Sequence, residues 1–210
     1  MTRSAPMGLG HFCLRRTAPV DFWGPSSKPI SRRAKVCQYQ GMDNNRARIM
    51  ILGIGCTLFA DQGFGIAVLE ELERRYDFPE HVRLVDGGLL GVGLFGTICQ
   101  CEHLIVIDTM CRNGRPGQIY RLQGREILAR LLDKNHVQQV EFLEALAHCQ
   151  VMDHPPRAVL LAVEPDDTQT LSCRLSPLLQ EKTEQMVQCI LAELEELGVP
   201  FHAKGKSSCA

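Results

Sequence analysis

From residue 47 onward, short apolar runs alternate along the chain with longer segments of helical periodicity. Such runs are typical of buried β-strands, and most of them are followed directly by glycine, aspartate or glutamate. On this pattern we predict five strands, at residues 48–54, 82–85, 104–107, 118–122 and 158–163.

The segments between these runs predict helices at residues 64–76, 89–99, 125–132 and 139–149, with a long helix after them. The long helix has clear start and stop signals. Ser176 stands where an N-cap is expected, Pro177 occupies the first helical position, and Gly198 follows the last periodic residue. We therefore expect this helix to run from Pro177 to about Leu197.

Strands that alternate with helices predict an α/β fold, here a single domain with a twisted, mostly parallel sheet and helices on both faces. The continuous apolar run at residues 104–107 agrees, because both faces of such a strand are buried. In an open sheet of this kind, ligands bind beyond the carboxyl ends of the strands. The residues that follow the strands are therefore the candidates for a functional site.

The first 41 residues differ in composition from the rest of the chain. They hold seven Lys and Arg residues, a single acid, and four of the eleven prolines. Neither a secretory signal nor a twin-arginine signal fits well, because no proper apolar run follows the basic residues. We interpret residues 1–41 as a disordered leader or a misassigned start, with Met42 as the alternative start, residues 42–202 as the folded domain, and residues 203–210 as a flexible tail.

Composition excludes several classes of protein. The chain is 45% hydrophobic and 22% charged, which argues against a disordered chain. Its formal net charge is -1 and its aromatic content 6%, so neither a basic surface nor a stacking platform for nucleic acid is expected. No apolar run approaches the roughly 18 residues of a membrane span. Ten irregularly spaced cysteines without a CxxC pair indicate reduced thiols in a cytoplasmic protein.

Polar side chains follow three of the predicted strands. Asp61 and Gln62 lie in the loop after the first strand, Asp86 follows the second, and Asp108 follows the third. We expect these four side chains to converge on one crevice, where their oxygens would suit a divalent metal. The alternative is that the loop acids cap helix N-termini, a role that suits Asp61 and Asp86 better than Asp108.

The first loop also contains the glycine pair Gly53 and Gly55, which raises the possibility of a dinucleotide site. The phosphate-binding fingerprint requires a third glycine where this chain has Leu58, and the loop is too long for a tight phosphate turn. No GxSxG or HExxH motif marks a hydrolytic site either. The cysteines and histidines show no arrangement that selects a nucleophile.

Taken in order, three motifs resemble those of the maturation endopeptidases of nickel–iron hydrogenases. They are the first loop with its glycines and Asp61, the turn Asp86-Gly87-Gly88, and the strand ending at Asp108. The resemblance covers about residues 49–199. It implies a single α/β domain that removes a C-terminal peptide from the hydrogenase large-subunit precursor once nickel is inserted. This reading agrees with the composition, from which we expect a cytoplasmic protein with no nucleic-acid partner and no membrane span.

The same resemblance implies the site residues. The family's three metal-binding positions fall on Gln62, on Asp108, and on His136 or, in the gapless register, Gln138. Asp108 would also be catalytic, and a supporting loop would comprise Asp61, Asp86, Gly87 and Gly88. The metal is nickel carried by the substrate, for which zinc or cadmium could substitute. The chain departs from the family pattern at Gln62, where an acid is usual, and at Gln138, where a histidine is usual.

The sequence leaves three possible functions open. In the first, the chain is an active endopeptidase, because substrate thiolates already hold the nickel and only weak extra ligands are needed. In the second, hydrolysis is lost and the chain is a binding or checkpoint module for the metallated large subunit. The third is a nucleotide-binding protein of the Rossmann type, against which the missing third glycine argues.

Overall fold

The computed structural model describes residues 49–88, 95–131, 140–151 and 155–205. The chain divides into two units, and every described residue belongs to the second, Gly41–Ala210. The predicted leader at residues 1–41 lies outside the described residues. Within the described ranges, no helix has the length and apolar character needed to cross a bilayer.

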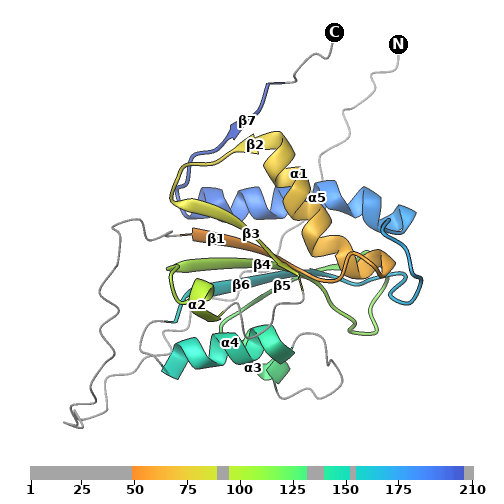
Figure 1. The fold of residues 1–210 in the computed structure, drawn as a ribbon, viewed down its shortest axis with the longest axis horizontal. Coiled ribbons are helices and arrows are strands. Elements are labelled where there is room, and N and C mark those ends of the chain that lie inside the picture. The colour runs from red at the N-terminus through yellow and green to blue at the C-terminus, as the bar shows by residue number, and fades with distance from the viewer. Residues whose placement is uncertain (1–48, 89–94, 132–139, 152–154, 206–210) are drawn as a thin grey trace, which may run out of the picture. The chain divides into compact units, whose positions relative to one another are not determined.

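A five-stranded sheet forms the middle layer of the second unit (Figure 1). Its strand order is β3-β1-β4-β6-β5; the first four strands run parallel, and β5 is antiparallel to β6. All five predicted strands are confirmed, and their bounds are β1 Ile49–Ile54, β3 Val82–Gly88, β4 His103–Thr109, β5 Ile119–Gln123 and β6 Arg157–Val163. The chain leaves β1 toward β3 and then crosses to β4 on the other side of β1, which makes their carboxyl edge the expected ligand-binding edge.

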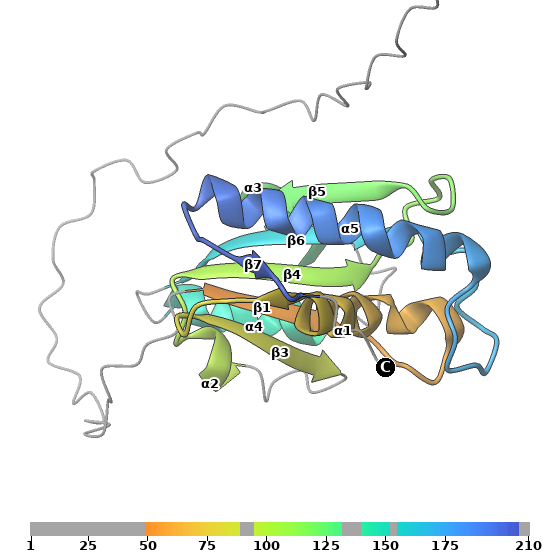
Figure 2. The same cartoon turned by 90° about the horizontal axis from the view of Figure 1, so that it is seen from above.

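Two long helices cover one face of the sheet, α1 (Phe64–Arg75) and α5 (Pro177–Glu196) (Figure 2). The capping signals of α5 act as predicted: the Ser176 side chain accepts a hydrogen bond from the Leu179 N–H at 3.3 Å, and Gly198 adopts a φ of 69° just past the helix end. The apolar side of α5 packs with α1 against the alternate residues of β1, β4 and β6, and together they form an apolar core.

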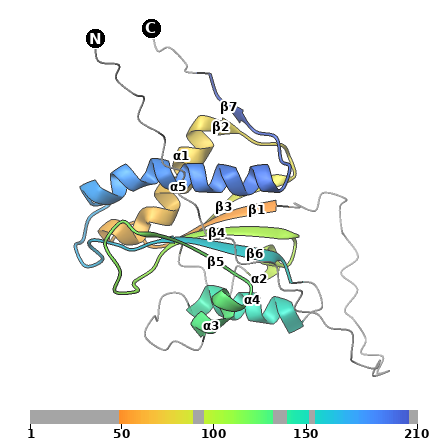
Figure 3. The same ribbon diagram turned by 180° about the vertical axis from the view of Figure 1, so that it is seen from behind.

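Three shorter helices cover the opposite face, α2 (Phe95–Ile98), α3 (Arg125–Leu131) and α4 (Val140–Val151) (Figure 3). Residues 89–94, the first part of the helix predicted at 89–99, lie outside the described residues, and the described part ends one residue early, at Ile98. β6 begins beside His103, at the amino edge of the sheet. α4 leads into β6 and therefore ends near that edge. α4 therefore starts near the carboxyl edge.

A small second sheet was not predicted. β2 (Tyr76–Asp77) and β7 (His202–Ala203) pair in antiparallel fashion, and the ring of Phe201 meets that of Tyr76 edge-on at 5.9 Å between centroids. The Lys204 N–H also donates to the Arg75 carbonyl at 2.8 Å. The boundary predicted at Ala203 for a flexible tail is therefore too early, because aromatic packing and backbone pairing hold this part of the chain.

Candidate functional site

The first loop, residues 55–63, folds back on itself at the carboxyl edge of the sheet. A Cβ atom on Gly55 would collide with the carbonyl oxygen of Gln62, and one on Gly65 would collide with the carbonyls of Ile54 and Ile107. Gly55 also has a φ of 139°, which favours glycine. The glycines of this loop thus serve close approach between backbone segments of the chain itself, a role that needs no bound nucleotide.

A second loop, residues 164–176, is hydrogen-bonded to the first along its length. The Ala60 N–H donates to the Ser172 carbonyl at 2.8 Å, and the Ser172 N–H donates to the Leu58 carbonyl at 3.0 Å. The Asp61 N–H donates to the Asp167 carbonyl at 3.0 Å. The first loop leads into α1 and the second into α5. These backbone hydrogen bonds therefore connect the starts of the two helices.

Asp61 makes the central side-chain contacts between the two loops. Its side chain is fully buried, one oxygen accepts from the N–H groups of Asp166 and Asp167 at 2.9 and 2.8 Å, and the other accepts from the Ser176 N–H at 2.7 Å. Three backbone donors satisfy a buried carboxylate well. Asp61 therefore braces the second loop, a structural role that differs from the predicted capping of a helix, since α1 has no side-chain cap and Ser176 caps α5.

Gln62 is half-buried beside the same second loop. Its amide nitrogen donates to the Thr168 carbonyl oxygen at 2.8 Å, which holds the side chain against the second loop. A glutamate here would have no hydrogen to donate and would face that carbonyl oxygen with a negative charge. The structure therefore gives a local reason for an amide at a position where the resembling family usually has an acid.

Asp86 and Asp108 lie on opposite faces of the sheet. Side chains alternate along a strand, and Leu84 packs in the α1 and α5 core whereas Val106 packs in the core under α2 and α4. Asp86, two residues after Leu84, therefore faces α1, and Asp108, two residues after Val106, faces the other side. Asp86 and Asp108 therefore do not converge on one crevice, contrary to what we predicted from the sequence.

The two aspartates also differ in environment. Asp86 is exposed, and its side chain accepts from the Gly88 N–H at 2.8 Å in a local turn. Asp108 is only 6% exposed, stands beside Ala162 of β6, and accepts from the Thr109 N–H at 2.7 Å. Asp108 is the stronger candidate for chemistry, because ligands of an open parallel sheet bind beyond the carboxyl ends of its strands, where this carboxylate is held in place.

Glu164 directly follows β6 at the carboxyl edge, and the sequence pattern marks it only as the end of a strand. It is 5% exposed, and its carboxylate accepts from the Arg112 N–H at 2.9 and 3.0 Å and from the Tyr120 hydroxyl at 2.8 Å. Burial and the adjacent Glu164 raise the pKa of Tyr120 to about 12. Glu164 thereby orders the loop that follows Asp108. The sequence does contain a signal for Glu164 as a candidate site residue, because it is an acid that directly follows an apolar strand, as Asp108 does.

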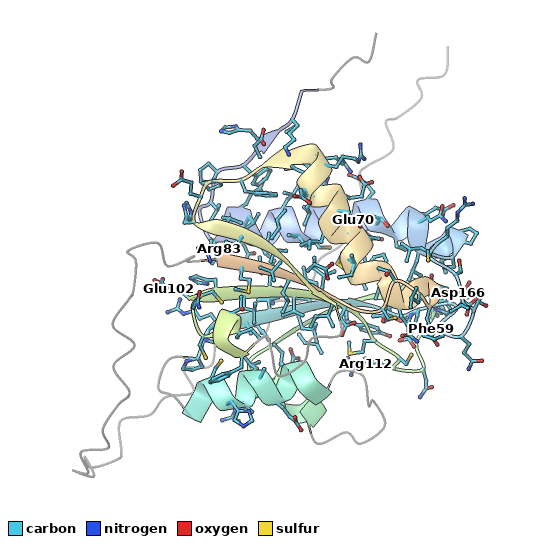
Figure 4. All side chains as sticks on the ribbon, in the orientation of Figure 1. Phe59, Glu70, Arg83, Glu102, Arg112 and Asp166 are labelled. Carbon is cyan, nitrogen blue, oxygen red and sulfur yellow. The ribbon has the colours of Figure 1, made fainter. Side chains whose placement is uncertain are left out.

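The carboxyl edge also carries exposed apolar side chains. Leu58, Phe59 and Leu171 are 55%, 38% and 75% exposed, and they lie on the first and second loops. Figure 4 shows Phe59, Asp166 and Arg112 at this edge, and Arg83 and Glu102 at the opposite one. Large exposed apolar side chains that gather beside a candidate site suit contact with another protein.

The remaining predicted positions, His136, Gln138 and the nearby Lys134, lie outside the described residues. In sequence they shortly precede α4, which starts near the carboxyl edge and on the face toward which Asp108 points. Among the described residues, no group of three or more His, Cys, Asp or Glu side chains could hold a metal ion. Of the three predicted metal-binding positions, the structure describes only those of Gln62 and Asp108.

Comparison with known proteins gives a consistent result. The family model described as hydrogenase maturation protease matches residues 66–193. The hydrogenase 2 maturation protease of Escherichia coli K12 is 30% identical over 154 residues, or 72% of this chain and 93% of that protein. A hydrogenase expression/formation protein of Azotobacter chroococcum is 34% identical over 160 residues, or 75% of this chain and 77% of that protein.

Solved structures agree with the sequence comparison. The hydrogenase maturating endopeptidase HybD from Escherichia coli superimposes with a TM-score of 0.72 at 29% identity, over 76% of this chain and 99% of that one. A hydrogenase maturation protease HycI from Thermococcus kodakarensis superimposes with a TM-score of 0.59 at 20% identity, over 72% and 95% of the two chains, and so supports the fold alone.

Proposed function

The chain belongs to the hydrogenase maturation protease family, a family of peptidases, and we propose that its substrate is the nickel-loaded large-subunit precursor of a nickel–iron hydrogenase. In this proposal it removes a C-terminal peptide from that precursor. Hydrolysis adds water across one peptide bond, which leaves a new carboxylate on the large subunit and a new amine on the released peptide.

The observation that carries the proposal is the buried carboxylate of Asp108. It stands at the carboxyl edge, on the face covered by α3 and α4, and Glu164 orders the loop that follows it. A carboxylate held there by its surroundings is preorganised to contact a metal ion that arrives with the substrate. Asp108 is therefore the residue that we propose contacts the nickel and orients the scissile bond.

The proposed metal is part of the substrate. The large subunit presents nickel on its own thiolates, which are strong ligands, so a few further donors suffice to sense the metal. We propose that Asp108 supplies the charged donor, that Gln62 supplies a neutral one, and that His136, or Gln138 in its place, supplies the third. Zinc or cadmium on the same thiolates could take the place of nickel.

The exposed apolar side chains of the first and second loops support a protein substrate. Leu58, Phe59 and Leu171 border the carboxyl edge, where a partner surface could cover them. Because Asp61 and the hydrogen bonds between the loops hold this border in place, binding would require little ordering of the backbone. We further propose that the reaction takes place in the cytoplasm, since all seven described cysteines are free.

The test uses nickel-loaded and nickel-free forms of a large-subunit precursor. Each is incubated with the full chain, and the mass of its C-terminus is measured. We expect truncation of the nickel-loaded precursor alone. Stable binding of that precursor without truncation would instead indicate the checkpoint module, and truncation without nickel would contradict the proposed role of the metal.

A further inference from the structure

Three thiols gather at the amino edge of the sheet, away from Asp108. Cys99 follows α2, Cys101 precedes β4, and Cys149 lies near the end of α4. The Sγ atoms of Cys99 and Cys149 are 2.6 Å apart, although the two residues are 50 positions apart in the sequence. That separation is only roughly 0.5 Å longer than the covalent bond of a disulfide. The helix packing thus brings the two sulfurs into bonding range.

We propose that Cys99 and Cys149 are a disulfide-forming pair, oxidised by a low-molecular-weight disulfide such as oxidised glutathione and reduced again by thiols. This modification site is independent of the proposed processing reaction. The structure shows its reduced state, because both cysteines are free.

The different exposure of the two sulfurs sets the order of the steps. Cys99 is half-buried, whereas Cys149 has no exposed surface, so an external disulfide meets Cys99 first. The Cys99 thiolate attacks one sulfur of oxidised glutathione, forms a mixed disulfide and releases one glutathione thiolate. Cys149 then loses its proton and attacks the Cys99 sulfur, which releases the second glutathione. Two protein thiols are oxidised by two electrons, and one glutathione disulfide is reduced.

The third thiol does not take part in the proposed pair. The Cys101 thiol donates to the Ile98 carbonyl at 3.1 Å and is 6% exposed. Burial raises the pKa of both Cys101 and Cys149 to about 12, so protonation does not distinguish them, and it is the short Sγ–Sγ distance that selects Cys149 as the partner of Cys99. A metal site is a poor alternative, because no three-residue metal-binding group occurs in the described part of the chain and two metal-bound sulfurs would not approach so closely.

The bond would join the end of α2 to the end of α4 and close a loop that contains β4, β5 and α3. Closing a loop of this length restricts the unfolded chain strongly and the folded chain little, because the sulfurs are already adjacent. We therefore expect the oxidised protein to melt on the order of 5–10 °C higher than the reduced protein.

The test exposes the full-length protein to oxidised glutathione and maps its peptides by mass spectrometry without reduction. The expected product is a peptide pair linked through Cys99 and Cys149 with the loss of two hydrogens, which returns to free thiols after reduction. Cys149→Ser should stop at the glutathione adduct on Cys99, and Cys99→Ser should give no linked pair.

Cys189→Ser is the matched control, since Cys189 is a partly buried thiol on α5 that the proposal does not use, and it should form the linked pair like the wild type. Three results would each overturn the proposal: a wild-type protein that stops at the glutathione adduct, a product linked mainly through Cys101, or an oxidised protein that melts no higher than the reduced one.

Discussion

The two faces of the sheet differ in what they bury. The face under α1 and α5 buries apolar side chains from two long helices, and its one fully buried acid, Asp61, bonds only to backbone N–H groups among the contacts described above. The face under α2, α3 and α4 carries Asp108 and a group of three thiols among its apolar residues. We infer that the first face mainly stabilises the fold and that the second carries the chemistry.

This difference separates two acids that look alike in the sequence. Asp61 and Asp108 both follow apolar strands, and both are buried. Asp61 joins the start of α1 to the start of α5, whereas Asp108 faces the side on which α4 begins. Substitutions on the two faces should therefore affect different measurements.

Asp61→Ala should lower the free energy of unfolding by about 4 kcal/mol, because three backbone N–H groups lose the buried carboxylate that accepts from them. Urea denaturation of the two proteins without added metal measures this change. A loss below about 1 kcal/mol would show that the hydrogen bonds of Asp61 contribute little to the stability of the α1 and α5 face.

Leu194→Ala should lower the free energy of unfolding by about 3 kcal/mol, because the side chain has no exposed surface in the α5 core and its removal leaves a cavity. At temperatures where the variant remains folded, precursor processing should continue at the wild-type rate. Thermal melts and the mass assay, run in parallel, test both parts, and a selective loss of processing would contradict the separation of the faces.

Asp108→Asn should slow processing about 100-fold, equivalent to about 2.7 kcal/mol of lost transition-state stabilisation. The amide oxygen can still accept from the Thr109 N–H, so the melting temperature should change by no more than a few degrees. Glu181→Gln, on the exposed side of α5, is the control for removal of one negative charge and should keep the wild-type rate. Undiminished processing by Asp108→Asn would remove this residue from the site.

Gln62→Glu should lower the free energy of unfolding by about 1 kcal/mol, since the hydrogen bond to the Thr168 carbonyl is lost. If Gln62 is a donor to the metal, the same change should tighten the binding of nickel or zinc, because a charged oxygen replaces a neutral one. Denaturation and metal titration of wild type and variant measure the two effects. A variant that matches the wild type in both would argue that Gln62 reaches neither partner.

The sequence pattern predicts much of the fold, because buried strands and amphipathic helices leave local signals. Ser176, Pro177 and Gly198 marked the ends of α5, and the apolar runs marked all five strands of the main sheet. The pairing of β2 with β7 was missed because two-residue strands have no periodicity. It depends instead on aromatic packing between segments far apart in the chain.

The site was harder to predict than the fold. The alternation of strands and helices predicts that the candidate residues lie at the carboxyl edge, but the faces toward which Asp86 and Asp108 point depend on the alternation of side chains along each strand. The role of Asp61 could not be read locally, because its three N–H partners lie more than 100 positions away in the sequence. Glu164 carried the same local signal as Asp108, and only its contacts distinguish it.

The proposed contact between Asp108 and the substrate's nickel is tested by measuring how tightly the large-subunit precursor binds, with and without nickel, to the wild type and to Asp108→Asn. If the Asp108 carboxylate contacts the substrate's nickel, nickel should tighten binding to the wild type, and the variant should lose most of that gain while binding the nickel-free precursor equally well. An equal gain in affinity from nickel in both proteins would show that the Asp108 carboxylate does not contact the metal.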